Sequence, residues 1–134
     1  MTEGTMSGAL RVVREWQGAI NRRDLERLRA ITAAGVAIVG PRGVGYGFDL
    51  LADWLGRAGL ALETRRSFVR GDTVVMEQEG VWSEVESGER RGAATVASAF
   101  VVADGRVIRY ARYDTLAEAL AATGLSADDE VVGG

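Results

Sequence analysis

The clearest pattern of apolar and polar positions in the chain lies between residues 95 and 113. Two runs rich in β-branched and aromatic residues, Thr95 to Val102 and Val107 to Tyr113, flank the sequence Ala103-Asp104-Gly105. An Asp-Gly pair between two such runs is a strong signal for a β-hairpin. The sequence therefore predicts a hairpin here, and the length of its loop decides which side chains share a face.

Two registers are possible for this hairpin. A two-residue turn puts Val101 on the same face as Ile108, whereas a three-residue loop with a left-handed Gly105 puts Phe100 opposite Ile108. We prefer the three-residue loop, because it separates bulky side chains from small ones and prepares one face for a helix or a pocket. The bulky face would carry Val96, Ser98, Phe100, Val102, Ile108, Tyr110 and Arg112. The other face would carry Thr95, Ala97, Ala99 and Ala111.

The remaining apolar patterns predict four helices and three further strands. Apolar residues recur at helical spacing from Ala9 to Ile20, Asp24 can cap a short second helix, and Thr115-x-x-Glu118 is a capping box. The third helix is expected at 48–58 and the strands at 36–39, 62–70 and 73–84.

These elements fit one domain, because the chain is long enough for a single core and too short for two ordinary ones. We expect that domain at residues 8–125. A flexible N-terminus at 1–7 would precede it, and an acidic flexible tail at 126–134 would follow it.

Composition excludes several kinds of chemistry. The chain has no cysteine and no histidine, so we expect no disulfide, no Cys/His metal site, no histidine base and no bound cofactor. A net charge of −3 argues against nucleic acid as a partner. No apolar run approaches the roughly 18 residues of a membrane span, and the first residues do not resemble a signal peptide. We therefore expect no membrane partner and a cytoplasmic location.

Several short segments, in this order, resemble the nuclear transport factor 2-like superfamily. The elbow Asn21-Arg22-Arg23-Asp24-Leu25 is similar to the family's N-x-x-D-L pattern, and a strand followed by Gly40-Pro41 comes next. Gly47 before the third helix and the closing segment from Gly105 to Asp114 add to the resemblance, which covers about residues 8–124. The group includes SnoaL-like cyclases, ketosteroid isomerase and limonene-epoxide hydrolase. The resemblance implies an α+β, cone-shaped fold, with a curved mixed or antiparallel sheet wrapped around N-terminal helices and enclosing an apolar pocket.

The resemblance also implies which side chains line this pocket. The implied ligand-binding residues are Trp16, Tyr46, Trp54, Met76, Trp82, Ser98, Phe100 and Tyr110, with Gln78 and Arg112 as polar members. The isomerases' catalytic Tyr and two Asp residues fall on Trp16, Gly40 and Ser98. The hydrolases' residues fall on Ala37, Val39, Gln78, Gly80 and Arg112, or on Glu79 or Val81 after a one-residue slip. Neither known mechanism is therefore retained, and whether the protein is an enzyme stays open.

Arg112 and Gln78 are the candidate catalytic residues, and each has a structural alternative. Arg112 could hold a carboxylate or enolate of a ligand, or it could pair with a glutamate of its own chain. Gln78 could orient a ligand carbonyl, or it could satisfy buried backbone groups. Glu77 and Glu79 share one strand face and could serve as acid and base, or they could pair with Arg109 across strands.

Two functions follow from these observations. The first is a SnoaL-like protein that binds a small apolar or aromatic molecule, or transforms it by isomerisation, cyclisation or hydration. The alternative is a non-catalytic, dimeric interaction module with a packed cone. We also expect a homodimer through an apolar patch on the outer face of the sheet. This patch would consist of Val75, Val81, Thr95, Ala97, Ala99, Val101 and Ala111.

Overall fold

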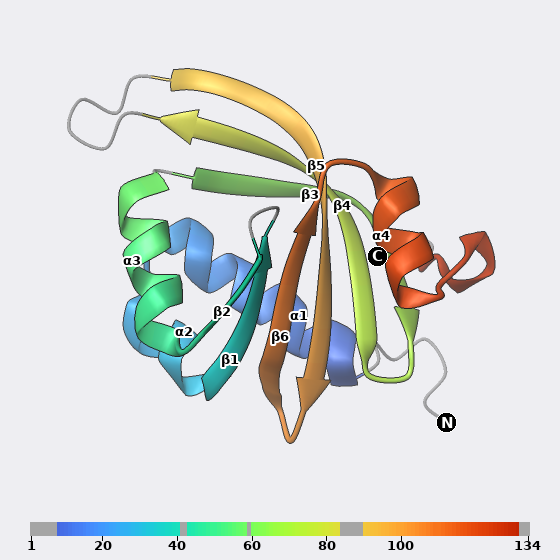
Figure 1. Cartoon of the computed structure of the whole chain (residues 1–134), viewed down its shortest axis with the longest axis horizontal. Helices are drawn as coiled ribbons and strands as arrows, with labels where there is room; N and C mark the ends of the chain where they lie inside the picture. Colours follow the sequence, from blue (N-terminus) through green and yellow to red (C-terminus); the bar gives the residue numbers. More distant parts are fainter. Residues whose placement is uncertain (1–7, 41–42, 59, 84–89, 132–134) are drawn as a thin grey trace.

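Six strands in the described part of the chain form one curved sheet (Figure 1). The computed structural model describes the backbone of residues 8–40, 43–58, 60–83 and 90–131, and their side chains outside 54–62 and 82–93. The strand order is β2-β1-β6-β5-β4-β3, and only β1 and β6 run parallel among these pairs. The strands are β1 (Thr32–Gly40), β2 (Gly43–Tyr46), β3 (Leu60–Arg70), β4 (Thr73–Ser83), β5 (Arg90–Ala103) and β6 (Arg106–Tyr113).

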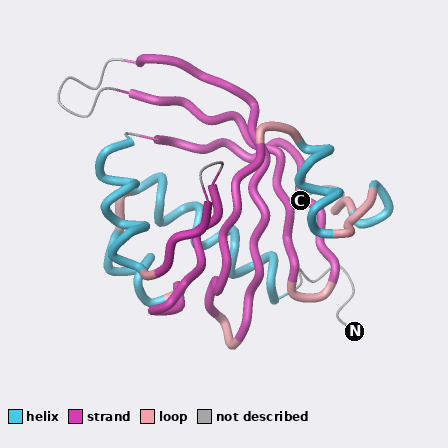
Figure 2. The backbone as a smooth tube through the Cα atoms, viewed as in Figure 1, coloured by secondary structure: helices cyan, strands magenta, loops and turns pink. Residues whose placement is uncertain are grey.

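Helices cover both faces of this sheet (Figure 2). They are α1 (Gly8–Arg22), α2 (Leu25–Ala30), α3 (Phe48–Ala58) and α4 (Leu116–Thr123), followed by a short 3-10 turn η1 (Ala127–Asp129). None of the helices in the described residues has the length and apolarity of a membrane span. The order of elements agrees with the sequence pattern except for β2, which occupies the glycine-rich stretch after Gly40.

Two apolar clusters lie on opposite faces of the sheet. On the inner face, α1 contributes Leu10, Val13 and Trp16 to a cluster with Phe100 and Tyr110. On the outer face, Ala119 of α4 and Leu125 join a second cluster, whose strand members are Phe68, Val75, Ala97, Ala99 and Ala111. The predicted α+β fold, a curved mixed sheet wrapped around N-terminal helices, is confirmed.

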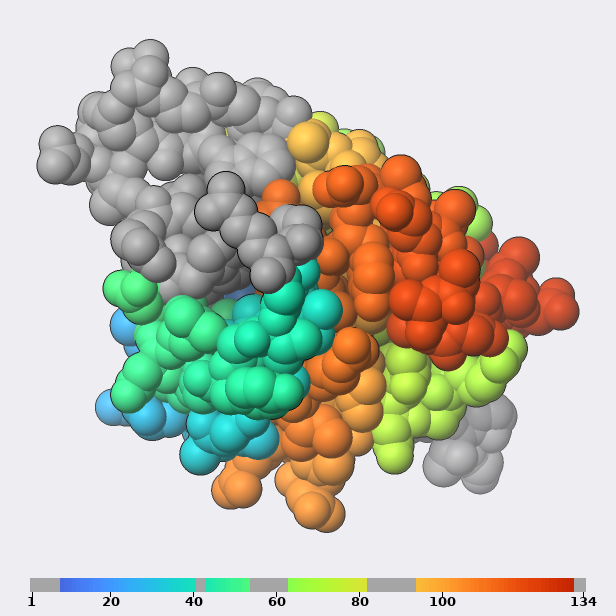
Figure 3. Space-filling model, in the orientation of Figure 1, coloured from blue at the N-terminus to red at the C-terminus, as the bar shows by residue number. Residues whose placement is uncertain are grey.

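The outer cluster changes the expected dimer patch. Figure 3 shows α4 seated against the sheet beside β6. Four members of the patch, namely Val75, Ala97, Ala99 and Ala111, are at most 3% exposed within a single chain. The premise that these side chains form an exposed surface was wrong, because the helix that follows Thr115 folds back over them.

The β5–β6 hairpin has a different loop from the preferred one. Ala103 pairs with Arg106, so Asp104 and Gly105 form a two-residue turn with φ angles of 52° and 75°. The register then shifts between Val101 and Val102, because Ile108 is an extra residue on β6. This bulge brings Phe100 opposite Tyr110 instead of Ile108, and Ile108 is 38% exposed. The predicted loop and the inward position of Ile108 were wrong.

The bulge nevertheless leaves the other predicted side chains on their expected faces. A two-residue turn alone would reverse the faces, and the added residue reverses them again. Ser98 therefore lies opposite Arg112 on the inner face, and Ala99 lies opposite Ala111 on the outer face.

The elbow between α1 and α2 ends the first helix with a left-handed residue that is not glycine. Arg23 has a φ of 58°. Its amide donates to the Ile20 carbonyl at 3.1 Å, and the amide of Asp24 donates to the Ala19 carbonyl at 2.9 Å. This is the Schellman arrangement, in which glycine is favoured at the left-handed position. Asp24 then caps α2 by accepting from the Arg27 amide at 3.0 Å.

Replacing Arg23 by glycine is therefore expected to stabilise the protein. A left-handed residue with a Cβ atom is disfavoured by about 1 kcal/mol, partly offset by the greater freedom of glycine in the unfolded chain. Urea denaturation should show a higher midpoint for Arg23→Gly than for the parent, and Arg22→Gly should show a lower one. A lower midpoint for Arg23→Gly would mean that the arginine side chain stabilises the elbow.

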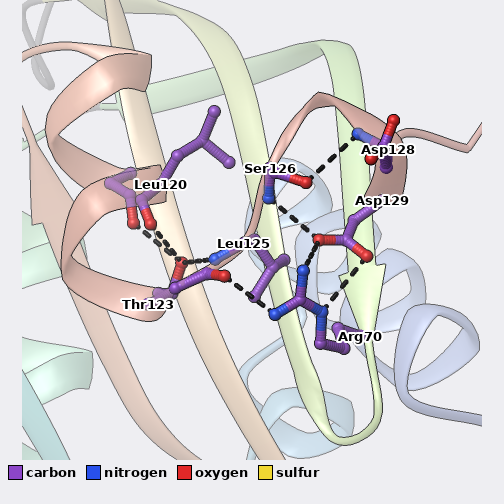
Figure 4. Close-up of polar contacts among 9 residues, drawn as sticks. Arg70, Leu120, Thr123, Leu125, Ser126, Asp128 and Asp129 are labelled. Atoms are coloured by element: carbon purple, nitrogen blue, oxygen red, sulfur yellow. Dashed lines mark hydrogen bonds and ion pairs between the residues drawn. The ribbon is translucent and has the colours of Figure 1, made fainter.

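The segment after α4 lies along the edge of β3 (Figure 4). The Val131 amide donates to the Ser67 carbonyl at 2.8 Å, and Phe68 forms a β-bridge with Glu130. Arg70 binds Asp129 at 2.6 Å and 3.2 Å, and Arg66 binds Glu130 at 2.9 Å and 3.0 Å. The Ser126 amide and the Arg70 guanidinium hold the pKa of Asp129 below its usual value. Where the sequence indicated a flexible tail, the structure gives residues 126–131 defined partners.

Candidate functional site

Three aromatic rings meet on the inner face of the sheet. Trp16, Phe100 and Tyr110 lie with ring centroids 5.1 to 5.3 Å apart, and each is at most 2% exposed. Trp16 of α1 reaches this face because it belongs to the apolar stripe of the helix that packs on the sheet. Its indole nitrogen donates to Thr32 Oγ1 at 2.9 Å, and the Thr32 hydroxyl donates onward to the Leu28 carbonyl at 2.6 Å. The Trp16 ring is therefore held by packing and by a directed hydrogen bond.

A chain of polar side chains lies on the same face. The Ser98 hydroxyl donates to Gln78 Oε1 at 2.8 Å, and Gln78 Nε2 donates to Gln17 Oε1. Gln17 Nε2 donates in turn to Thr64 Oγ1 at 2.5 Å. Ser98 and Gln78 are fully buried, and Gln17 is 8% exposed.

Met76 lies beside this chain and is 1% exposed. Thr64 Oγ1 and Gln78 Nε2 approach its sulfur at 3.6 Å and 3.8 Å. All buried side-chain nitrogen and oxygen atoms of the described residues have a hydrogen-bond partner. The polar chain is therefore satisfied within the protein, as buried polar groups generally are.

Tyr110 and Arg112 continue the site along β6. In the strand register, Tyr110 lies opposite Phe100 and half-buried Arg112 lies opposite Ser98. Burial raises the pKa of Tyr110, while its hydrogen bond with Ser98 and the charge of Arg112 act in the opposite direction. A neutral phenol thus stands next to a guanidinium group at the end of the polar chain. Such a pair can bind a ligand oxygen that is neutral or negatively charged.

Comparison with known proteins shows the family to which the chain belongs. A SnoaL-like domain model matches residues 13–110, from the first turns of α1 to Tyr110. The chain belongs to the SnoaL-like domain family. No curated protein matches it. The family match confirms the resemblance to the nuclear transport factor 2-like superfamily.

Solved structures share the fold of this SnoaL-like domain at low sequence identity. An LEH-like epoxide hydrolase of Mycobacterium tuberculosis is 20% identical, with a TM-score of 0.71, covering 85% of this chain and 83% of that one. RV0760c of the same organism, solved in complex with estradiol-17beta-hemisuccinate, is 16% identical, with a TM-score of 0.71 and coverages of 84% and 97%. TerC, co-crystallised with polyporic acid, is 19% identical, with a TM-score of 0.69 and coverages of 84% and 95%.

The SnoaL-like domain brings together most of the described residues that sequence analysis named. Trp16, Met76, Gln78, Ser98, Phe100 and Tyr110 are all buried on its inner face, with Arg112 in register beside them. The side chains of Trp54 and Trp82 lie outside the described ones.

Tyr46 does not join the inner cluster of the SnoaL-like domain. It is 69% exposed on the edge strand β2. Tyr46 pairs with Ala37, which pairs with Arg109, and Arg109 pairs with Val101. These positions alternate with Tyr110 and Phe100, so they lie on the outer face. The prediction that Tyr46 lines the cone was wrong, because no local pattern indicated the β1–β2 pairing that sets the direction of its side chain.

Gln17 and Thr64 complete the polar chain of the SnoaL-like domain, and neither was among the predicted site residues. Gln17 follows Leu10 and Val13 at helical spacing, so a polar residue on the apolar stripe of α1 was the available signal. Nothing comparable marked Thr64. The predicted pairing of Glu79 with Arg109 was wrong, since Glu79 binds Arg65 at 2.7 Å and Arg109 lies opposite Val101. A bulge between Thr64 and Arg66 leaves Arg65 as the extra residue on β3.

Proposed function

We propose that this SnoaL-like domain binds a small apolar or aromatic molecule on the inner face of its sheet, or transforms it by isomerisation, cyclisation or hydration. The observation that carries the proposal is the position of Tyr110. Its buried phenol lies against two aromatic rings and is hydrogen-bonded to Ser98. It also interacts electrostatically with the charge of Arg112. Apolar surface with a few directed polar groups is the usual composition of a small-molecule site.

The proposed chemistry uses positioning and a polar hydrogen-bonding group instead of a histidine base or a metal. The sequence has no histidine or cysteine. Arg112 would stabilise a carboxylate or enolate, and Gln78 would orient the Ser98 hydroxyl beside Tyr110. The proposed setting is the cytoplasm, without a bound cofactor. Two structural neighbours support this class of ligand, since RV0760c was solved with estradiol-17beta-hemisuccinate and TerC with polyporic acid.

Arg112→Met tests this proposal with a matched pair of probes. Estradiol-17beta-hemisuccinate carries a carboxylate that estradiol lacks, so a guanidinium at the site should favour the hemisuccinate. We expect calorimetry to show about tenfold weaker binding of the hemisuccinate to Arg112→Met, with binding of estradiol changed much less. Arg112→Lys should retain part of the preference, because the charge remains.

Thermal denaturation is the control for this experiment. If Arg112→Met binds both probes as the parent does, the arginine is not part of the site. If Arg112→Met unfolds, the arginine supports the structure through partners in its own chain, and the enzyme proposal loses its main residue.

A second candidate function is a dimeric interaction module, which two observations favour. The polar chain on the inner face is satisfied internally, and Tyr46 and Val44 on β2 are 69% and 52% exposed. Val44 pairs with Val39, so both exposed side chains lie on the outer face beyond the part that α4 covers. A homodimer is proposed through this remaining surface of β1, β2 and β6.

The dimer proposal predicts an effect of charge on β2. The parent should sediment at about twice the monomer mass at tens of micromolar, and Tyr46→Arg should sediment as a monomer. Leu25→Arg is the control, because Leu25 is also 48% exposed but lies on α2. A monomeric parent protein would remove the dimer and leave the ligand proposal in place.

A further inference from the structure

The polar chain on the inner face has a direction. Ser98 donates to Gln78, Gln78 donates to Gln17, and Gln17 donates to Thr64. A hydroxyl group has only one proton to donate, and that of Ser98 is directed at Gln78. In this arrangement Tyr110 can only donate to Ser98, so the phenol oxygen has only acceptor capacity left for another group.

The opposite direction satisfies the same side chains. The oxygen and nitrogen of a glutamine amide are nearly equal in size, so a half-turn of each amide exchanges donor and acceptor. After both turns, Thr64 would donate to Gln17, Gln17 to Gln78, Gln78 to Ser98, and Ser98 to Tyr110. The Thr64 hydroxyl, which is 3.6 Å from the weakly accepting sulfur of Met76, would then gain an amide oxygen as its acceptor. Tyr110 would have its proton available for another group.

We propose that Gln17 and Gln78 are positioning residues that set whether Tyr110 donates or accepts a hydrogen bond toward a ligand. This inference rests on the proposed function, and it narrows the ligand class. A phenol that can take both roles suits a molecule whose oxygen changes between a keto form, which only accepts, and an enol form, which also donates. Reversal by turning amides requires no proton to pass through them.

The surroundings of Tyr110 let the chain of polar side chains determine whether its hydroxyl donates or accepts a hydrogen bond. Tyr110 is 2% exposed, so bulk water has little access to compete with Ser98 for its hydroxyl. Trp16 and Phe100 pack against the ring and carry no charge. Arg112 is the charged group in the described residues whose field acts on the phenol. Ser98, and through it Gln78, is therefore the neutral partner that can favour one protonation state of Tyr110 over the other.

The first test needs no ligand. In a Tyr46→Phe, Tyr113→Phe background, ultraviolet absorbance follows ionisation of Tyr110 alone. Ser98→Ala should raise the titration midpoint, because no hydroxyl can then donate to the phenolate. Gln78→Leu should lower it, because Ser98 is released to donate to the phenolate without turning an amide. Gln17→Leu should move it in the same direction as Gln78→Leu.

Val96→Ala is the matched control for this titration. Val96 pairs with Gln78 in register and is 6% exposed, so the change opens space beside the chain without altering its hydrogen bonds. Its midpoint should match that of the background, with circular dichroism confirming the fold at each pH. An unchanged midpoint in Gln78→Leu, or an equal shift in Val96→Ala, would overturn the inference.

The second test uses two neutral probes of similar size. 2-Naphthol can donate and accept a hydrogen bond, whereas 2-acetylnaphthalene can only accept. At a pH where its carboxyl group is ionised, Gln78→Glu keeps an acceptor for Ser98 and removes the donor, so Tyr110 continues to donate to Ser98. We expect binding of 2-acetylnaphthalene to weaken about tenfold while binding of 2-naphthol changes little.

The two tests separate this inference from the proposed function. If Gln78→Glu changes the affinities for both probes equally, the inference that Gln78 sets the hydrogen-bonding role of Tyr110 is overturned, but ligand binding stays established. Failure of both probes to bind the parent, together with the expected titration shifts, would support the hydrogen-bond chain and contradict the small-molecule function.

Discussion

Trp16→Ala is expected to lower the free energy of unfolding by about 3 to 5 kcal/mol, the usual effect of emptying a large aromatic side chain from a core. Trp16 is fully buried and contacts both Phe100 and Tyr110. Its loss also removes the hydrogen bond to Thr32 and the contact that holds α1 against the inner face. A domain of this size has about 5 to 15 kcal/mol of stability, so the variant should be close to unfolding at room temperature.

Chemical denaturation of Trp16→Ala and Trp16→Phe measures this effect. Trp16→Phe keeps an aromatic ring at the contact but loses the donor to Thr32, so it should be destabilised by less than half as much. A loss below about 1 kcal/mol for Trp16→Ala would contradict its place in the core. Leu25→Ala, on the exposed side of α2, provides a reference with a small expected change.

Gln78→Leu is expected to lower the free energy of unfolding by about 2 to 4 kcal/mol, although leucine is apolar and similar in size. The substitution leaves Ser98 Oγ without its acceptor and Gln17 Oε1 without its donor. Buried polar groups that lose a partner typically cost about 1 to 3 kcal/mol each, and the turn of Ser98 toward Tyr110 recovers part of this.

A double variant distinguishes this explanation from a simple packing defect. Gln17→Leu combined with Gln78→Leu removes both members of one hydrogen bond, so the loss should be smaller than the sum of the two single losses by roughly 0.5 kcal/mol or more. Urea denaturation of the four proteins gives the coupling. Additive losses, or a stable Gln78→Leu, would show that the amide chain contributes little to the fold.

Sequence patterns predicted most helices and strands correctly, because apolar residues recur with the period of the element whose face is buried. The apolar stripe of α1 and the bulky face of β5 both become the inner cluster. The face on which a strand residue lies was predictable even where its partner was not. Alternation along a strand shows which residues share a face, but it does not show which residue of the next strand lies opposite.

Several differences between the sequence-based predictions and the structure share a physical cause, which is contact between distant parts of the chain. Tyr46 faces outward because β2 pairs with β1, and no local pattern marked that pairing. Residues 126–131 look like an acidic tail in isolation, but Arg66 and Arg70, about 60 residues earlier, bind their carboxylates. The pairing of Gln17 with Gln78 is equally remote in sequence. Such contacts require the whole fold to be known.

The bulge at Ile108 allows the β5–β6 hairpin to lose one residue without a change in the pairing of its strands. Without Ile108, Val102 would still lie opposite Val107. Val101, Phe100 and the residues of β5 that precede them would also keep their present partners on β6. Loss of most other residues within β6 would turn Tyr110 or Arg112 to the opposite side of the sheet. Position 108 is thus a place where a one-residue gap in a related sequence would leave the inner face unchanged. An alignment of relatives that puts a gap elsewhere in β6 would exchange inward and outward residues.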